Sequence, residues 1–371
     1  MPLRERVAII GAGHVGATTA YALMLRALFR EIVLIDSDAA LAEAEAADLS
    51  DANALARPAR ILAGTYADAA SARIAVITAG AATQGSQTRL SVAAQSAKIV
   101  AGCASQLAGA GFRGVLVVAA NPVDLMAQVA FRHAGLPAPQ VIGTGTLLDS
   151  SRLRQRLAER LNVAPTSVDG DVLGEHGDSE VAAFSTVRIG GLRLEHFAGA
   201  ERDPNRAQLA DDVRQDGYRI VAGKGYTSFG MATATVRICE AILRDEKAVL
   251  PVSTLTTGQY GIADIFLSLP CVLGAAGVER VLAPDLTASE RAMRKDPGTY
   301  SRAAVNTSMP MDEPNPATST RANILLGIEV SVSSRRLSAA SSQEPVAAAS
   351  SASTVPVVLA ISVATRATPT V

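Results

Sequence analysis

The chain contains no tryptophan and little cysteine. Its three cysteines, Cys103, Cys239 and Cys271, lie far apart among 371 residues. Their odd number and wide spacing match neither a disulfide framework nor the closely paired ligands of a zinc site. We therefore expect no bound metal and a protein that works in a reducing compartment, which is most often the cytoplasm.

The chain also lacks an excess of either charge and any long hydrophobic run. Its 34 basic and 35 acidic residues give a formal net charge of −1, which provides no general attraction to nucleic acid or to an anionic membrane. No run of about 18 apolar residues is present to span a bilayer, and the segment MPLRER at the start does not resemble a signal peptide. We expect a cytoplasmic protein without a nucleic-acid or membrane partner.

A glycine-rich segment near the N-terminus is the first motif that indicates a ligand. Residues 7–10 form a continuous apolar run, which is typical of a strand buried on both faces of a parallel sheet. A GxGxxG motif follows at once and opens a helical stretch, and a second apolar run ends at Asp36. The residues of the motif are Gly11, Ala12, Gly13, His14, Val15 and Gly16. In this context the motif predicts a dinucleotide site.

Each glycine of the motif has a separate physical task. Gly11 permits a tight turn, Gly13 lets a pyrophosphate approach the backbone, and Gly16 lets the helix pack on the strand. The helix N-terminus offers unpaired N–H groups to the phosphates. Asp36 would accept hydrogen bonds from the adenosine ribose and repel a 2′-phosphate, which favours NAD over NADP. The less favoured alternative is a tight turn that binds nothing.

Apolar runs and helical stretches continue to alternate as far as residue 142, which predicts a doubly wound parallel sheet. We therefore expect an α/β fold, with a Rossmann NAD-binding domain over residues 1–142 and an α+β substrate domain over residues 143–295. Ligands bind at the carboxyl ends of the strands in such sheets. The loops near Gly80 and Asn121 are therefore expected to contact the cofactor.

One histidine, His176, lies between two glycines in the segment LGEHGDS near the middle of the chain. Asp149 and Arg152 are three residues apart on a predicted helix, so they share a face; alone, they would be an ordinary ion pair. With His176 they can divide a chemical task. The carboxylate would fix the tautomer of the imidazole and favour its protonated form. The guanidinium would hold a substrate carboxylate through two hydrogen bonds.

These motifs, together with several others, resemble the L-lactate/malate dehydrogenase family from residue 6 to about residue 291. The matching segments are GAGHVG, the strand end at Asp36, QTRL, NPVD, GTGTLLDSSR, GEHGDS and KGYTS. Within the family the chain looks closest to the L-2-hydroxyisocaproate dehydrogenases, with the L-lactate dehydrogenases next.

The resemblance implies a reaction and a set of residue roles. His176 would exchange the hydroxyl proton of a 2-hydroxy acid while a hydride moves between substrate C2 and the nicotinamide of NAD. Asp149 would orient His176, and Arg152 would hold the substrate carboxylate. Arg89, in a mobile loop, would close over the site and polarise the carbonyl. Two further residues complete the expected set, Asn121 near the reacting oxygen and Thr144 at the nicotinamide amide.

The resemblance also implies a homodimer or homotetramer acting on a small 2-oxo or 2-hydroxy acid. An alternative of a different class is a dinucleotide-binding protein without catalysis. The presence of Arg89, Asp149, Arg152 and His176 together argues against that alternative.

The family pattern also identifies positions that set substrate choice. Thr83, followed by Gln84, stands where lactate dehydrogenases carry Gln and malate dehydrogenases carry Arg, which counts against malate. Thr227 matches the pocket threonine of the family, and Gly217 stands ten residues before it, where a larger residue is common. Thr83 and Gly217 would enlarge the pocket, so we expect a 2-oxo acid with an apolar side chain, such as 2-oxoisocaproate. The alternative is pyruvate, through a one-residue loop shift that brings in Gln84.

The effector site of the family gives a further expectation. Many bacterial lactate dehydrogenases bind fructose bisphosphate with an arginine and a histidine. Arg154 matches the first, but Asp169 occupies the second position. An acid there would repel phosphate, so we expect no activation by this ligand.

The composition changes after residue 295. Residues 296–371 are rich in Ser, Ala and Thr, and Tyr300 is their only aromatic residue. The segment has too few large apolar side chains for their burial to offset the conformational entropy lost on folding. The composition therefore predicts disorder. The segment is either an interaction segment or an extension without function, such as a change of reading frame produces.

Overall fold

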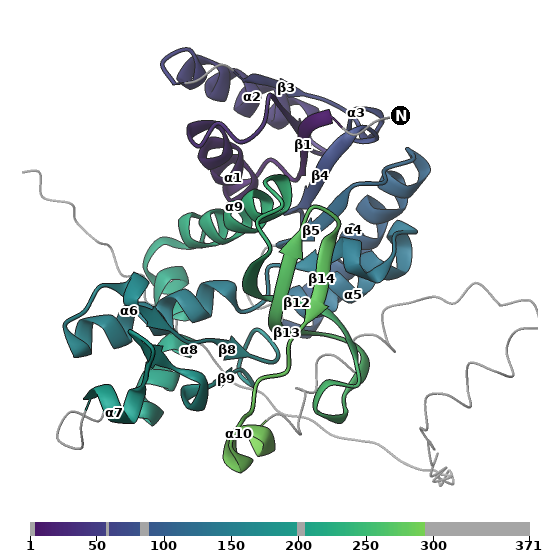
Figure 1. Ribbon diagram of the computed structural model, residues 1–371. Helices are drawn as coiled ribbons and strands as arrows, with labels where there is room; N and C mark the ends of the chain where they lie inside the picture. Colours follow the sequence, from purple (N-terminus) through teal and green to yellow (C-terminus); the bar gives the residue numbers. More distant parts are fainter. Residues whose placement is uncertain (1–3, 57–58, 82–88, 199–204, 294–371) are drawn as a thin grey trace, which may run out of the picture. The chain divides into compact units, whose positions relative to one another are not determined.

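The computed structural model describes residues 4–56, 59–81, 89–198 and 205–293, with the side chains of residues 4, 89–91, 198, 292 and 293 left aside (Figure 1). The predicted disordered segment, residues 296–371, lies outside these residues. So do Thr83 and Gln84.

Strands and helices alternate through the first half of the chain, as the sequence predicts. The elements are β1 (Arg4–Ile10), α1 (His14–Leu25), β2 (Glu31–Ile35), α2 (Ala39–Asn53), β3 (Arg60–Ala63), α3 (Tyr66–Ala69), β4 (Ala72–Ile77), α4 (Arg89–Gly109), β5 (Val115–Val118), α5 (Val123–Ala134) and β6 (Val141–Gly143). The six strands are parallel in the order β6-β5-β4-β1-β2-β3. Because the order reverses between β1 and β4, the crevice at their carboxyl ends is the expected ligand position.

The second half mixes helices with short and long strands. Its elements are α6 (Leu147–Leu161), β7 (Val168–Asp169), β8 (Val172–Leu173), β9 (Val181–Ala182), β10 (Arg188–Ile189), β11 (Leu192–Arg193), α7 (Leu194–Ala198), α8 (Arg206–Lys224), α9 (Phe229–Leu243), β12 (Ala248–Thr257), β13 (Ala263–Gly274), β14 (Gly277–Val281) and α10 (Ala288–Met293). Short 3₁₀ turns cover Ala138–Gln140, Pro165–Ser167, Phe184–Thr186 and Gln259–Gly261. The α10 helix begins with a capping box, in which Thr287 and Glu290 exchange hydrogen bonds.

The strands β12, β13 and β14 join the sheet of the first half. They add antiparallel to β6, with Ser253 opposite Gly143, so nine of the described strands form one sheet. The sequence places these strands in the second half but does not reveal their partner. The strands of two smaller sheets, β11-β10-β7 and β8-β9, come from the chain between β6 and β12, and the turn that joins β8 to β9 carries His176.

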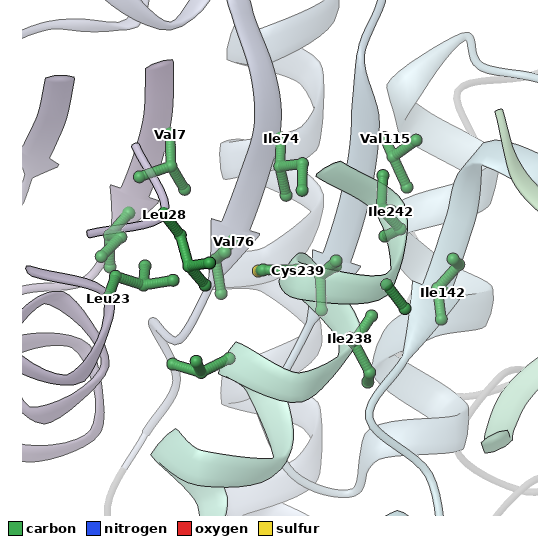
Figure 2. Close-up of a cluster of buried hydrophobic side chains, with 14 of the residues drawn as sticks. Val7, Leu23, Leu28, Ile74, Val76, Val115, Ile142, Ile238, Cys239 and Ile242 are labelled. Carbon is green, nitrogen blue, oxygen red and sulfur yellow. The ribbon is translucent and has the colours of Figure 1, made fainter. Parts of the chain in front are cut away.

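Hydrophobic residues fill both faces of the long sheet. One core holds side chains of α1, α2 and α9 against alternate residues of the strands, and the other holds α4 and α5. Figure 2 shows Ile238, Cys239 and Ile242 of α9 among Val7, Ile74 and Val115 of the sheet. The helix that follows Thr227 is therefore anchored on the same sheet as the glycine-rich loop.

The cysteines lie in the interior of the protein. Cys103, Cys239 and Cys271 are buried and carry no disulfide bond. No helix in the described ranges is long and apolar enough to cross a bilayer.

Candidate active site

The glycine-rich loop joins β1 to α1, and its glycines have the predicted geometry. Gly11 has a φ of +105°, and a Cβ there would lie 2.6 Å from the backbone nitrogen of Ala79. A Cβ on Gly16 would lie 1.8 Å from the carbonyl oxygen of Gly11, so helix and loop pack too closely for a side chain. A Cβ on Gly13 would meet nothing within 4 Å. The backbone at Gly13 is thus open to a phosphate, next to the exposed His14 that begins α1.

Asp36 lies against this loop from the end of β2. Its carboxylate accepts hydrogen bonds from the backbone N–H of Ala12 at 2.7 Å and of Asp38 at 3.0 Å. A carboxylate has about four acceptor positions, so these bonds fix Asp36 beside the loop and leave acceptors for ribose hydroxyls.

Three other predicted cofactor residues follow adjacent strands at the same edge of the sheet. Gly80 comes after β4, Asn121 after β5 and Thr144 after β6; the first two are exposed and Thr144 is 1% exposed. Within the described ranges the hydroxyl oxygen of Thr144 has no hydrogen-bond partner. A buried hydroxyl without a partner is unfavourable, so this atom is a fitting partner for the amide of a nicotinamide. The open Gly13, Asp36 and Thr144 together fit a dinucleotide.

His176 and Asp149 form a directly hydrogen-bonded pair. The imidazole lies on the turn between β8 and β9, where Gly174 and Gly177 have φ values of +96° and +153°. Its Nδ1 is 2.6 Å from Oδ2 of Asp149, in the first turn of α6. The carboxylate faces Nδ1, which assigns the neutral-state proton to that nitrogen and leaves Nε2 for another partner.

Arg152 completes the predicted triad one helical turn from Asp149. Its Nη1 donates a hydrogen bond to Oδ1 of Asp149 at 2.8 Å, and the side chain is 15% exposed. Asp149 itself is 2% exposed. The guanidinium has five N–H donors, so the bond to Asp149 leaves donors for a substrate carboxylate.

The electrostatics of the pair favour a charged imidazole. Burial lowers the pKa of His176, but the charge and hydrogen bond of Asp149, helped by the charges of Glu180 and Asp124, outweigh burial and raise it to about 9. Burial raises the pKa of Asp149, and the charges and hydrogen bonds of His176 and Arg152 outweigh it, so that pKa lies below its usual range. At neutral pH the site holds a carboxylate and an imidazolium.

Two buried acids near His176 have no role in the sequence-based interpretation. Asp124, 5% exposed in the first turn of α5, accepts a hydrogen bond from the backbone N–H of His176 at 2.7 Å and from the Ser253 hydroxyl at 2.5 Å. Burial, only partly offset by these bonds, raises its pKa to about 6. Asp124 is the last residue of the family motif NPVD, and this position is the signal in the sequence that could have identified it.

The second of these acids, Glu180, directly precedes β9 and is 6% exposed. Burial and the charge of Asp149 raise its pKa to about 8, against the lowering charges of His176, Arg214 and Arg152. It follows the segment GEHGDS by one position, and only its place beside that motif could have indicated it.

The predicted substrate wall is only partly described. Gly217 lies on α8, where a Cβ would meet nothing within 4 Å, and Thr227 lies between α8 and α9. The helix is tied to the turn of His176 because the Tyr218 hydroxyl donates to Asp178 at 3.0 Å. Arg89 is the first residue of α4, but its side chain lies outside the described part, as do Thr83 and Gln84. The structure thus brings Asp149, Arg152 and His176 together, and their roles stay predictions.

Ring stacking links the glycine-rich loop to the segment that carries Thr227. The rings of His14 and Tyr226 stack with centroids 3.9 Å apart and planes 12° apart. The Lys224 ammonium lies 4.3 Å from the centroid of the Tyr226 ring and 4.4 Å from that of Phe229. Sequence reasoning assigned His14 only as part of the cofactor loop and did not foresee this contact.

Arg154, the expected effector arginine, is engaged within the protein. Its guanidinium donates to Asp171 at 2.7 Å and to the carbonyl oxygen of Gly170 at 2.9 Å, with Asp169 at 3.9 Å. Two acids therefore already neutralise the cation that a bisphosphate would need.

Comparison with known proteins agrees with this geometry. Residues 5–143 match the family model of the lactate/malate dehydrogenase NAD binding domain, and residues 146–298 match that of the lactate/malate dehydrogenase alpha/beta C-terminal domain. The L-lactate dehydrogenase of Thermus aquaticus is 43% identical over 290 residues, 77% of this chain and 94% of that protein. That of Clostridium botulinum strain 657 is 41% identical over 289 residues, 77% of this chain and 91% of that protein.

A solved structure is similarly close. The minor L-lactate dehydrogenase of Enterococcus mundtii, in its ligands-bound form, is 38% identical and has a TM-score of 0.80, with 83% of this chain and 99% of that chain covered. A Rossmann-like sheet with an NAD-binding edge, an Asp–His pair beside an arginine, and relatives of this similarity lead to one conclusion. The chain belongs to the lactate/malate dehydrogenase family, as an NAD-dependent dehydrogenase of the lactate type that acts on a small 2-hydroxy or 2-oxo acid.

Proposed function

We propose that the protein is an L-lactate dehydrogenase, which reduces pyruvate with NADH and oxidises L-lactate with NAD⁺. The observation that carries the proposal is the Asp149–His176 contact of 2.6 Å beside Arg152, at the end of an NAD-binding sheet. The names of the relatives from Thermus aquaticus and Clostridium botulinum support lactate rather than a bulkier substrate.

The residues divide the reaction between them. Arg152 holds the substrate carboxylate and so sets the position of C2. His176, charged at neutral pH because its pKa is about 9, donates the proton from Nε2 to the keto oxygen during reduction and takes it back during oxidation. Asp149 keeps Nδ1 protonated and the ring oriented. NADH, when bound, supplies the hydride that C2 receives.

Five further residues have supporting roles in this proposal. Arg89 would polarise the carbonyl, and Thr83 or Gln84 would line the substrate side chain. Asn121 would contact the reacting oxygen, and Thr144 would bind the nicotinamide amide with its unpartnered hydroxyl.

A second candidate substrate has one observation in its favour. Gly217 leaves open space on α8, since a Cβ there meets nothing within 4 Å. Each additional buried methylene contributes roughly 0.8 kcal/mol to binding, so a 2-oxo acid such as 2-oxoisocaproate remains the second candidate. Malate is less favoured because residues 82–88 contain no cation for a second carboxylate.

The experiment that separates these substrates is a kcat/KM panel. The protein is assayed with NADH and pyruvate, 2-oxoisocaproate or oxaloacetate, following absorbance of NADH. We expect pyruvate to have the highest kcat/KM. A preference for 2-oxoisocaproate would instead support the enlarged pocket, and NADH binding without turnover of any of the three would contradict a catalytic function.

We also propose that the enzyme is a homodimer or homotetramer. Large apolar side chains remain exposed on neighbouring helices in the single chain: Tyr21, Leu25, Tyr218, Ile220, Val221 and Phe229. Apolar surface of this kind is typical of protein interfaces. Light scattering after size exclusion measures the assembled mass, and a monomer at micromolar concentration would contradict the proposal.

A further inference from the structure

Glu180 is a buried acid beside the proposed proton-transfer residue, and the reaction above assigns it no task. It immediately precedes β9, four residues after His176. Its side chain is 6% exposed, although a carboxyl group is rarely buried without a reason. One side-chain nitrogen or oxygen atom each of Asp149, His176 and Glu180 lies within 4.8 Å of the other two. The three groups therefore interact electrostatically.

The surroundings of this cluster come from several elements. Burial and the charge of Asp149 oppose ionisation of Glu180, and the charges of His176, Arg214 and Arg152 favour it. On the His176 side, Asp149 and Asp124 add negative charge. Among the described residues, the titratable and charged groups around the cluster are Asp124 of α5, Asp149 and Arg152 of α6, Glu175 and Asp178 of the His176 turn, and Arg214 of α8.

We infer that Glu180 is a positioning residue of the proton-transfer step, one that holds the proton on His176 at alkaline pH and so extends the pH range of 2-oxo acid reduction. The inference rests on the proposed function, in which the imidazolium is the proton donor. A negative charge within about 4–6 Å of an imidazole raises its pKa by roughly one to three pH units. Glu180 at 4.8 Å or less lies in that range.

The effect depends on pH in a defined direction. Below its own pKa of about 8, Glu180 is neutral and adds no charge beside His176. Above it, the carboxylate appears next to the imidazolium and stabilises it. Glu180 thus acts where His176 would otherwise begin to lose its proton, and it has little effect in acid.

The first test is Glu180→Gln, assayed in both directions across pH. Gln has the shape of the neutral acid, which is the form that the fold contains below pH 8. We expect kcat/KM for pyruvate reduction to match the wild type at pH 6 and to fall about tenfold below it at pH 10, which corresponds to a His176 pKa lower by about one pH unit. Lactate oxidation, which needs neutral His176, should not fall at pH 10. Equal losses in both directions at every pH would overturn the inference.

Two further variants separate charge from shape. Glu180→Asp keeps the carboxylate and should retain most of the alkaline activity that Glu180→Gln loses, whereas loss of that activity in both variants would overturn the inference. Glu195→Gln removes an acid whose side chain is 49% exposed on α7, and its pH profile should be that of the wild type.

The second test does not depend on turnover. The chain has four histidines, His14, His133, His176 and His196, so NMR of labelled histidine follows each titration directly, with His176→Asn identifying the relevant signal. We expect Glu180→Gln to lower the His176 midpoint by about one pH unit and to leave the other three unchanged. An unchanged His176 midpoint would overturn the inference. Absence of turnover in the wild type would contradict the proposed function while leaving this titration decisive for Glu180.

Discussion

Three buried carboxyl groups lie around His176, and their surroundings move their pKa values in opposite directions. Burial raises the pKa of Asp124 to about 6 and that of Glu180 to about 8. The same burial acts on Asp149, but His176 and Arg152 outweigh it and the pKa falls. Asp149 stays charged because each of its carboxylate oxygens has a cationic partner, Arg152 at Oδ1 and His176 at Oδ2. The charged carboxylate in turn orients the imidazole.

Asp149→Asn tests that requirement. The amide keeps the shape but removes the charge and can present an N–H to Nδ1, which stabilises the unproductive tautomer and lowers the pKa of His176. We expect kcat to fall by a factor on the order of 10²–10⁴. Because the substitution keeps the shape of the side chain, whose hydrogen bonds go to Arg152 and His176, NADH affinity measured by fluorescence titration should stay the same. A kcat close to that of the wild type would contradict the assigned role.

The ion pairs of Arg154 lead to a prediction about regulation. Asp171 at 2.7 Å and Asp169 at 3.9 Å neutralise its guanidinium, so a bisphosphate would have to displace one acid and approach another. We expect fructose bisphosphate to leave the KM for pyruvate unchanged in steady-state assays. A clear fall in that KM on adding the compound would show that the acids give way to phosphate.

The sequence predicts the site residues that lie in recognisable motifs. His176 between two glycines, and Asp149 three residues before Arg152, lie together as expected. Asp124 and Glu180 were not predicted as site residues because an acid looks alike in sequence whether it is solvated or buried. Only the tertiary packing of α5 and of the strand β9 places them next to the imidazole.

Among the elements, the contact between α1 and the segment joining α8 to α9 connects two parts of the site. His14 begins α1 at the glycine-rich loop, and Tyr226 directly precedes Thr227. Their stacked rings therefore join the expected pyrophosphate position to the expected substrate wall, and the Lys224 ammonium lies over the rings of Tyr226 and Phe229.

Tyr226→Ala should loosen this connection. An aromatic pair contributes roughly 0.5–1.5 kcal/mol beyond its buried area, so we expect the Kd for NADH to rise about three- to tenfold. Tyr226→Phe keeps the ring and should behave like the wild type. The change can be followed by NADH fluorescence, which has no tryptophan background in this chain. Equal weakening in both variants would mean that the hydroxyl, and not the stack, is what matters.

Asp124 ties three elements together, since it lies in α5 and holds both the His176 turn and Ser253 of β12. Its folded-state pKa of about 6 lies above its usual value of 3.8. Proton binding at Asp124 therefore stabilises the fold below about pH 4, and this contribution is lost as the pH rises through 6.

Asp124→Asn removes this titration while it keeps an acceptor for the N–H of His176. Between about pH 4 and pH 7 the wild type should lose stability relative to the variant. Urea unfolding followed by circular dichroism at several pH values measures the difference. A difference that does not vary with pH would contradict the raised pKa.

The order of the elements follows from the sequence, but their pairing does so only in part. Continuous apolar runs predict buried parallel strands, and β1, β4 and β5 have this burial. The sequence 249–254 also predicts a strand, yet alternation within one strand does not tell which edge it joins. That β12 extends the parallel sheet at β6 depends on the packing of α9 beneath it, which only the fold provides.

For the molecule as a whole, stability depends on α9 as a buried part of the first-half sheet. Ile238, Cys239 and Ile242 are fully buried between strands and helix. We expect Ile238→Ala to lower the free energy of unfolding by about 2–5 kcal/mol, through lost burial and a cavity. Leu55→Ala, at a residue that is 93% exposed, is the matched control and should cost less than about 1 kcal/mol. Urea denaturation measures both, and similar losses would contradict the assigned core.

The pairing of β12 with β6 has a consequence for recombination between relatives. The two family models divide the chain between residues 143 and 146, yet Ser253 of the second part lies opposite Gly143 of the first in one continuous sheet. In a chimaera joined at that boundary, β12 would have to match the edge of β6 from another protein, and α9 would have to pack on that protein's sheet. The catalytic residues would have to match as well. The two parts therefore form one structural unit, and exchanges within the family should succeed at surface loops rather than at this junction.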